Sequence, residues 1–517
     1  MSTPLRELTP VTPATLPGEE RALDFFFNHA AYRLAGFFEA SFWTGISLQL
    51  SLSEPAIRQA LAAIGSLYEQ EASPSRRSTT LKQSNVHPTL SLHLYNKSIQ
   101  SVIQKTRDPT ATPIVVMATI LFASYEFLRA DATAASTHIT NGVNLLQRWR
   151  DHNGEHSKGL AWPQRYSSFQ SHFMETELAP ILSLFSVNSS QFAPGPHRRI
   201  VLNGVDDRGL VFIASEFRNI REARVAFTDL VTANVGIFER IESGLKKGEL
   251  PTADSLAVFR DMQSCIHRWK INFEALCQEH QQVWDAKDMN AAIALRIMWH
   301  SAILGIRSYL VQEESDWDAY RADYEELVQL AECLLARPAD NHDIFANALS
   351  VDFGLIFPLH GAAWKCRWPD LRRRGLHLLT RVSKREWLLD ADQYDTIFTR
   401  IMELEEASLG VTRGISQQAN VLVPEYARIH DFYCEAVPYS AQWGHQVAIT
   451  FVSKPQGPDG PWHFMTERIP VGVSSSGGVV LPSNLISCKS WETPRATDPE
   501  KWMALKSLMF GGRLEGE

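Results

Sequence analysis

A long apolar run at residues 113–128 constrains the fold of this chain more than any other part of the sequence. Nearly every position in it is apolar, so at helical pitch it leaves almost no polar face for solvent. We therefore expect a helix that other parts of the protein surround. Thr112 and Pro113 predict its start, because a threonine can accept orphan amides at a helix N-terminus and proline is tolerated in the first turn.

A second helix is expected directly after this run. Beyond a break at residues 130–133, apolar residues recur at spacings of three and four from Ala135 to Leu146. This spacing is typical of a helix that buries one side. The two segments together predict a helical hairpin with a short connection.

Helical patterns cover most of the remaining chain. The opening, residues 23–43, is unusually aromatic and predicts a first piece of core. Ser53 can cap the helix that follows it. The most regular stripe includes Trp269 and Phe273, at the spacing of a helix that docks one face. The helices we expect lie near residues 55–68, 95–103, 173–185, 217–231, 259–276, 288–311, 317–336, 346–365, 369–385 and 391–409.

The C-terminal part has a different pattern. Alternating apolar residues at 447–451 and 462–464 flank a Gly- and Pro-rich turn at 457–461, which predicts a β-hairpin. The fold class we expect is all-α, a large multi-helix domain with a small β-hairpin-containing C-terminal appendage. Its parts would be a disordered segment at 1–18, the helical domain at 19–415, and the appendage with an irregular tail at 416–517.

Composition limits the classes of partner. The 517-residue chain carries 50 Lys and Arg against 58 Asp and Glu, a formal charge of -8, whereas a protein that grips nucleic-acid phosphates usually shows a basic footprint. The six cysteines are scattered without paired spacing, which suits a reducing compartment. We expect neither a secretory signal nor a membrane span, because the apolar run is shorter than the ~20 residues that a span needs.

One group of residues has the right types for a metal site. Cys265, His267, Cys277 and His280 could ligate zinc, but Cys265 and Cys277 lie twelve residues apart on one expected helix, about 18 Å at 1.5 Å per residue. One ion cannot span that distance. We therefore favour packed or solvated side chains over a metal site.

The densest basic run could attract a phosphate, a nucleic acid or a nuclear-import receptor. Leucines interleave with it at helical spacing, so we favour a solvated or ion-paired face of a packed helix. The run consists of Lys365, Arg367, Arg372, Arg373, Arg374, Arg381, Lys384 and Arg385.

No catalytic residue can be assigned. His360 and Glu386 are the minimum needed for acid–base chemistry, but any large protein contains such a pair. The stretch Gly472–Gly477 misses the nucleophile-elbow pattern by one residue, and no phosphate loop or dinucleotide fingerprint occurs. We assign no catalytic, cofactor-binding or metal-binding residue and expect no cofactor.

Several segments in collinear order resemble the regulatory middle region of fungal zinc-cluster transcription factors. The similar segments span about residues 19–435 and include Ala22–Glu69, Leu121–Leu146, Phe353–Leu379 and Ile401–Gly410. The resemblance implies an all-α regulatory domain and a role in transcription. Members of that family usually carry an N-terminal module in which six clustered cysteines hold two zinc ions. The first cysteine here is Cys265, so we expect this sequence to lack that module.

The resemblance leaves three readings of function. The first is a nuclear transcription regulator or co-regulator, connected to a secondary-metabolite gene cluster, that acts without its own zinc cluster. The second is an enzyme or small-molecule-binding protein that reuses the helical fold in a biosynthetic pathway. The third is a truncated gene model of a full zinc-cluster transcription factor. The cytoplasm is the alternative to a nuclear location. The first reading implies protein partners, either a second copy or a full-length relative, with a small-molecule effector as an option and without sequence-specific DNA binding by this chain alone.

Overall fold

The computed structural model is predominantly helical, which confirms the expected fold class. It describes residues 17–38, 41–72, 89–153, 168–192, 199–206, 210–246, 253–307, 311, 313–337, 349–352, 354–382, 385–409, 421–436, 446–457 and 460–470. The segment 1–16 and the tail from residue 471, including Gly472–Gly477, lie outside these ranges.

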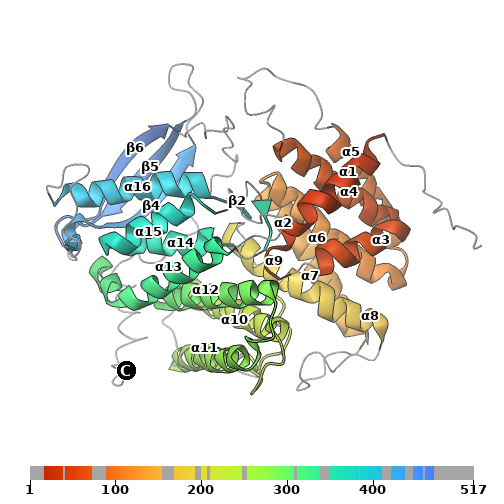
Figure 1. Ribbon diagram of the computed structural model, residues 1–517, viewed down its shortest axis with the longest axis horizontal. Coiled ribbons are helices and arrows are strands. Elements are labelled where there is room, and N and C mark those ends of the chain that lie inside the picture. The colour runs from red at the N-terminus through yellow and green to blue at the C-terminus, as the bar shows by residue number, and fades with distance from the viewer. Residues whose placement is uncertain are drawn as a thin grey trace, which may run out of the picture.

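The N-terminal helices pack around a first core, on the right of Figure 1. They are α1 (Glu19–Phe25), η1 (Phe26–Ala30), α2 (Ala31–Ala35), η2 (Ser41–Ile46), α3 (Ser47–Ser53), α4 (Pro55–Ala72), α5 (Thr89–Lys105), α6 (Thr112–Leu128), α7 (Ala132–Asn153), α8 (Phe169–His172), η5 (Phe173–Leu178) and α9 (Ala179–Phe192). The aromatic opening contributes Phe26, Phe42 and Trp43 to this core, as expected.

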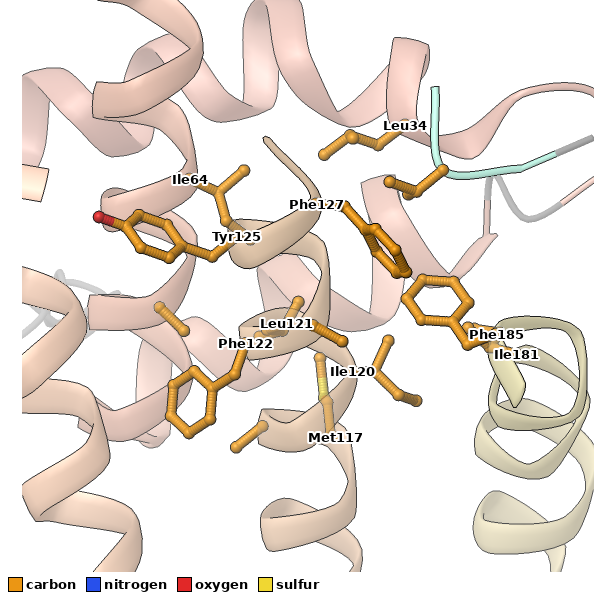
Figure 2. Close-up of a cluster of buried hydrophobic side chains, with 14 of the residues drawn as sticks. Leu34, Ile64, Met117, Ile120, Leu121, Phe122, Tyr125, Phe127, Ile181 and Phe185 are labelled. Carbon is orange, nitrogen blue, oxygen red and sulfur yellow. The ribbon is translucent and has the colours of Figure 1, made fainter. Parts of the chain in front are cut away.

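Helix α6 lies inside the first core, as its composition predicts. Its residues Pro113 and Val115–Leu128 are all buried. Figure 2 shows Met117, Ile120 and Phe127 among side chains from other elements, with Phe185 of α9 beside Phe127. With the turn that precedes it, the segment Pro109–Leu128 is 20 residues long and apolar enough to cross a membrane by length and composition, as is Ala286–Arg307. Neighbouring helices bury 83% of the apolar window of the first segment, so burial within the fold accounts for its composition.

The start of α6 differs from the expectation. Thr112 does not cap it: the N-cap is Ala111, without a side-chain bond, and the Thr112 hydroxyl donates to the Pro109 carbonyl at 2.7 Å. The capping side chain is Asp108, which serves the preceding 3-10 turn η4 (Pro109–Ala111). The expected hairpin with α7 is confirmed, and Asp131 accepts the Ala134 amide at 2.9 Å where α7 begins.

Two further cores follow along the chain. One lies between α10 (Ile220–Lys246), α11 (Ala253–His280) and α12 (Ala286–Arg307). The expected stripe of α11 is buried there, including Trp269 and Phe273, while the side chain of Phe259 lies outside the described residues. The other packs α12 against η6 (Glu314–Tyr320), α13 (Arg321–Ala336), α14 (Ile356–Lys365), α15 (Pro369–Leu379) and α16 (Ala391–Ala407).

Two helix boundaries were predicted wrongly in this last part. The segment expected as one helix at 346–365 begins as strand β1 (Leu349–Ser350), and α14 starts only at Ile356. The helix expected at 369–385 ends at Leu379, and β2 (Arg385–Glu386) follows. Strand β2 pairs in parallel with β1 and antiparallel with β3 (Leu389–Asp390). Such short strands exist only through their pairing with distant segments.

A three-stranded antiparallel sheet closes the described chain, at the upper left of Figure 1. Its strands are β4 (Ile429–Ala436), β5 (Gln446–Ser453) and β6 (His463–Pro470). The expected hairpin is β5 and β6, and the sequence reading missed β4. Phe432, Ile449 and Phe451 pack on the C-terminal core, so the sheet covers the helices α14 and α16.

Candidate functional site

Three cations of the basic run, Lys365, Arg367 and Arg372, lie inside the C-terminal core and not on a solvated face. Arg367 and Arg372 are about 1% exposed, although the sequence favoured a solvated or ion-paired surface. Both donate to Glu405 of α16, Arg367 Nη2 at 2.9 Å and Arg372 Nη1 at 2.6 Å. The interpretation as ion-paired side chains is confirmed, and the interpretation as solvated is wrong for these two.

A second buried carboxylate completes this arrangement. Glu314 of η6 is 0% exposed and accepts from Lys365 Nζ at 2.9 Å and from Arg367 Nη1 at 3.0 Å. We call Glu314, Lys365, Arg367, Arg372 and Glu405 the ion network. Two carboxylates and three cations leave this buried group with one excess positive charge, and an unpaired charge is costly to bury.

The ion network holds the first strand of the C-terminal sheet. Lys365 Nζ donates to the His430 carbonyl at 2.8 Å, and Arg367 Nη2 donates to the Ile429 carbonyl at 3.0 Å. The Ile429 amide in turn donates to Glu405 at 2.8 Å. Burial opposes the charge of Glu405, but Arg367 and Arg372 hold its pKa below the ordinary value. The network therefore fastens η6, α14 and α16 to β4.

Further ion pairs surround the network. Arg428 donates to Asp318 at 2.6 Å and 2.9 Å. Glu425 accepts the backbone amides of Glu314 at 3.0 Å and of Ser315 at 2.6 Å. Burial alone would raise the pKa of Glu425, but these amides and the neighbouring His430 lower it to about 2.

The rest of the basic run is closer to solvent. Arg373 pairs with Glu406 at 2.6 Å and Arg374 pairs with Glu332 at 2.7 Å, both partly exposed. Arg381 is exposed, and Lys384 lies outside the described residues. The cations that looked most suited to phosphate are thus already matched by carboxylates of this chain.

His360 and Glu386 have separate surroundings. The Glu386 carboxylate accepts the amides of Leu355 and Ile356 at 2.7 Å each, so it caps the start of α14. Burial raises its pKa to about 8, against the opposing effect of these two bonds. The His360 ring packs on Phe357 and on Trp364, and burial lowers its pKa to about 4. Within the described ranges no hydrogen bond joins the two side chains, so they form no acid–base pair.

The cysteine and histidine residues of α11 point to different environments. Cys265 and Cys277 are buried, while His267 is exposed and His280 is partly exposed. Burial raises the pKa of Cys277 to about 11, which disfavours the thiolate that binds metals. Among the described residues no group of three or more His, Cys, Asp or Glu side chains is placed to hold a metal ion.

The sequence reading missed a junction between the N-terminal and C-terminal cores, built on β1, β2 and β3. Trp387, at the turn between β2 and β3, inserts its ring into the first core, 5.0 Å from Phe127 and 4.8 Å from Phe185. Its positive φ of 54° is unusual for a bulky residue, and its indole donates to the Asp352 carbonyl at 3.2 Å.

Two arginines strengthen this junction. Arg385 donates to the Leu128 carbonyl at the end of α6, at 2.6 Å. Arg224 of α10 pairs with Asp352 at 2.5 Å and stacks on Phe38, 4.1 Å from the ring centre. These contacts join elements of all three cores beside one small sheet. The features that mark this sheet are the long-range pairing of its strands and the positive φ of Trp387.

The comparisons with known proteins concern the N-terminal core. Residues 21–188 match the family model described as "Fungal specific transcription factor domain". No curated protein and no solved structure matches the chain. The matched residues run from α1 through α9, so they include the buried helix α6 and its hairpin with α7. Residues 21–188 of this chain are therefore similar to the fungal specific transcription factor domain.

Proposed function

We propose that this protein regulates transcription in a fungal nucleus through contacts with other proteins, while another segment or another protein reads the DNA sequence. The family match supports a role in transcription regulation. The burial of the central basic residues supports the second part of the proposal, that another segment or protein reads the DNA. The central cations of the basic run bind Glu314 and Glu405 inside the C-terminal core, so they offer no positive face to a phosphate backbone.

A tethering experiment tests the regulatory role. The chain is fused to an unrelated DNA-binding module, and a reporter gene with sites for that module is measured in fungal cells. We expect reporter output to rise or fall several-fold relative to the module alone. Equal output from the fusion and the module, with the fusion present in the nucleus at the same level, would contradict the proposal.

A binding experiment tests the expectation that this chain alone does not bind DNA sequence-specifically. We expect the purified chain to show no sequence-specific affinity for promoter fragments at ~150 mM salt, because the chain carries a formal net charge of -8 and Arg367 and Arg372 of its basic run are buried in ion pairs. A specific complex that persists at higher salt would show that this chain reads DNA by itself.

The target genes and the effector follow from the resemblance and are proposals as well. We propose that the chain controls a secondary-metabolite gene cluster, as a co-regulator that a full-length relative carries to DNA. Deletion of the gene should change transcripts of one cluster and leave most others unaltered. Small metabolites of that cluster should then be screened for a rise in melting temperature, which a ligand specific to the folded state produces.

A further inference from the structure

The loop at residues 199–206, between α9 and α10, is held to α10 by one buried carboxylate. Asp229 of α10 is 0% exposed, and its Oδ1 accepts the Leu202 amide at 2.8 Å. Its Oδ2 accepts the backbone amide of Asn203 at 2.8 Å and the side-chain amide of Asn203 at 2.9 Å. Asp229 therefore fixes both the backbone and the side chain of Asn203.

This attachment lies where the chain passes from one core to the next. Ile200 and Leu202 belong to the N-terminal core, and the Ser183 hydroxyl of α9 donates to the Ile200 carbonyl at 2.7 Å. Beyond the loop, Leu210 belongs to the core of α10, α11 and α12. The hydrogen bonds of Asp229 thus hold the segment that joins these two cores.

The residue after Asn203 is Gly204, and this pair is chemically labile. Asparagine is a thermolabile residue, and a following glycine has no side chain to hinder attack of its backbone nitrogen on the asparagine amide. Gly204 has a φ of 82°, and a Cβ there would have no atom within 4 Å. Within the described ranges no hydrogen bond engages the Gly204 N–H, whereas its carbonyl accepts the Phe212 amide at 3.5 Å. The attacking nitrogen is therefore available.

Deamidation at this pair requires only water. The Gly204 nitrogen gives its proton to solvent and attacks Cγ of Asn203. The bond from Cγ to Nδ2 then breaks, and Nδ2 takes a proton from solvent and leaves as ammonia. One water molecule opens the resulting cyclic imide at either carbonyl, which gives aspartate or isoaspartate. The sum is one water consumed, one ammonia released, and a neutral side chain converted into an anion.

We propose that Asn203–Gly204 is a spontaneous deamidation site, and that the product releases the loop from Asp229. The new carboxylate replaces an amide that donated at 2.9 Å, so a hydrogen bond becomes a contact between two anions. This place already disfavours one anion, because burial raises the pKa of Asp229 to about 7 although three N–H donors oppose the rise. The inference does not depend on the proposed role in transcription.

A second Asn-Gly pair serves as an internal control. Asn141–Gly142 lies within α7, and Asn141 is exposed. In a helix the amide of residue 142 donates to the carbonyl four residues earlier. Gly142 also packs against α6, where a Cβ would lie 2.4 Å from Thr119 Oγ1. We therefore expect this pair to stay intact. The third pair, Asn153–Gly154, extends beyond the described residues and is left out of the comparison.

Peptide mass spectrometry of the full chain, after prolonged incubation in the folded state, tests the site. Trypsin places Asn203 in the peptide 200–208 and Asn141 in the peptide 130–148. We expect the mass gain of an amide-to-acid conversion, assigned to each asparagine by fragment ions, to accumulate several-fold faster at Asn203. A freshly purified sample, digested in parallel, gives the background. Equal accumulation at the two asparagines, or none at Asn203, would overturn the proposed site.

The variant Asn203→Asp tests the release of the loop. We expect a lower melting temperature than the parent's and faster hydrogen–deuterium exchange of the Leu202 and Asp229-bound loop amides. Asn141→Asp is the matched control and should stay near the parent in both measurements. If Asn203→Asp does not fold, the deamidated fraction of the aged parent, separated by ion-exchange chromatography, is measured instead. Parental exchange in the loop after deamidation would contradict the release.

Discussion

The N-terminal and C-terminal cores are both well buried, but different forces hold them. Around α6 the contacts are mainly apolar, with Glu126 paired to Arg129 at the end of the helix, and Phe127, Phe185 and Leu121 are buried among other side chains. In the C-terminal core the ion network lies beside the apolar side chains and holds β4 against the helices. Charged side chains within a regular helical pattern can therefore be as deeply buried as apolar ones when carboxylates and backbone carbonyls accept their hydrogen bonds.

Acid should separate the two regions with the largest effect, because it protonates several carboxylates at once. The folded-state pKa of Glu425 is about 2, below the ~4.3 of an unfolded chain, so its stabilising effect is present above that range and lost as pH falls toward about 2. Glu405 has a lowered pKa and acts in the same direction. In the N-terminal core burial raises the pKa of Glu126, so protonation of this carboxyl does not weaken the fold.

The measurement is tryptophan fluorescence and circular dichroism between pH 5 and pH 2. We expect the environment of Trp364, beside Phe432 of β4, to change before helix content falls. Trp364→Phe identifies its share of the fluorescence signal. Simultaneous loss of both signals would show that the two cores do not differ in this respect.

Breaking the ion network by mutation is the next largest effect. Glu405→Ala leaves Arg367 and Arg372 buried without their shared carboxylate, and we expect a loss of about 3–5 kcal/mol in the free energy of unfolding. Glu403→Ala is the matched control on the same helix, because its pair with Arg400 is partly exposed and such pairs contribute about 0–1 kcal/mol. Urea unfolding of both variants checks the difference, and equal losses would contradict a special role for the network.

Truncating buried aromatic side chains in the core between α10, α11 and α12 measures how much apolar packing contributes to stability. Trp269→Ala and Phe273→Ala should each cost about 3–5 kcal/mol, because both rings are almost fully buried between α10, α11 and α12. Ile271→Ala should change stability by less than about 0.5 kcal/mol, since it is exposed on the same helix. Thermal melts of the three variants decide the matter: if the parent and Trp269→Ala melt alike, the stripe does not carry this core.

The junction between the cores should respond with the smallest effect. Arg385→Ala removes the charge-assisted bond to the Leu128 carbonyl, and we expect a loss of about 1.5–3 kcal/mol. The two cores should then unfold in separate steps in differential scanning calorimetry. A single sharp transition at the parent's temperature would mean that Trp387 and Asp352 couple the cores without Arg385.

The sequence predicts the parts of the fold that local pattern determines. The apolar run gives α6, the stripe with Trp269 gives α11, and alternation with a Gly-rich turn gives β5 and β6. The cap of α6 is an exception. The sequence predicts Thr112 as the capping residue, but the capping side chain is Asp108, which caps the preceding turn η4. Capping depends on the backbone direction at the first turn, which the sequence pattern does not determine.

Distant partners determine what the sequence could not predict. Arg367 looks like a surface residue because its partners, Glu314 and Glu405, lie 53 and 38 residues away in the chain. Strand β1 has two residues, and only its pairing with β2 makes it a strand. The alternation of Phe432 and Cys434, both buried, was a signal that could have revealed β4.

Hydrogen–deuterium exchange of Glu405→Ala tests most directly the claim that matched buried charges hold the C-terminal sheet while apolar packing holds the N-terminal core. At neutral pH, with Glu403→Ala beside it, we expect the amides of β4 and β5 to exchange much faster than in the parent. Those of α6 should keep the parent's protection, because local openings of one region need not involve the other. Unchanged exchange in β4 and β5, or an equal loss of protection in α6, would contradict the account.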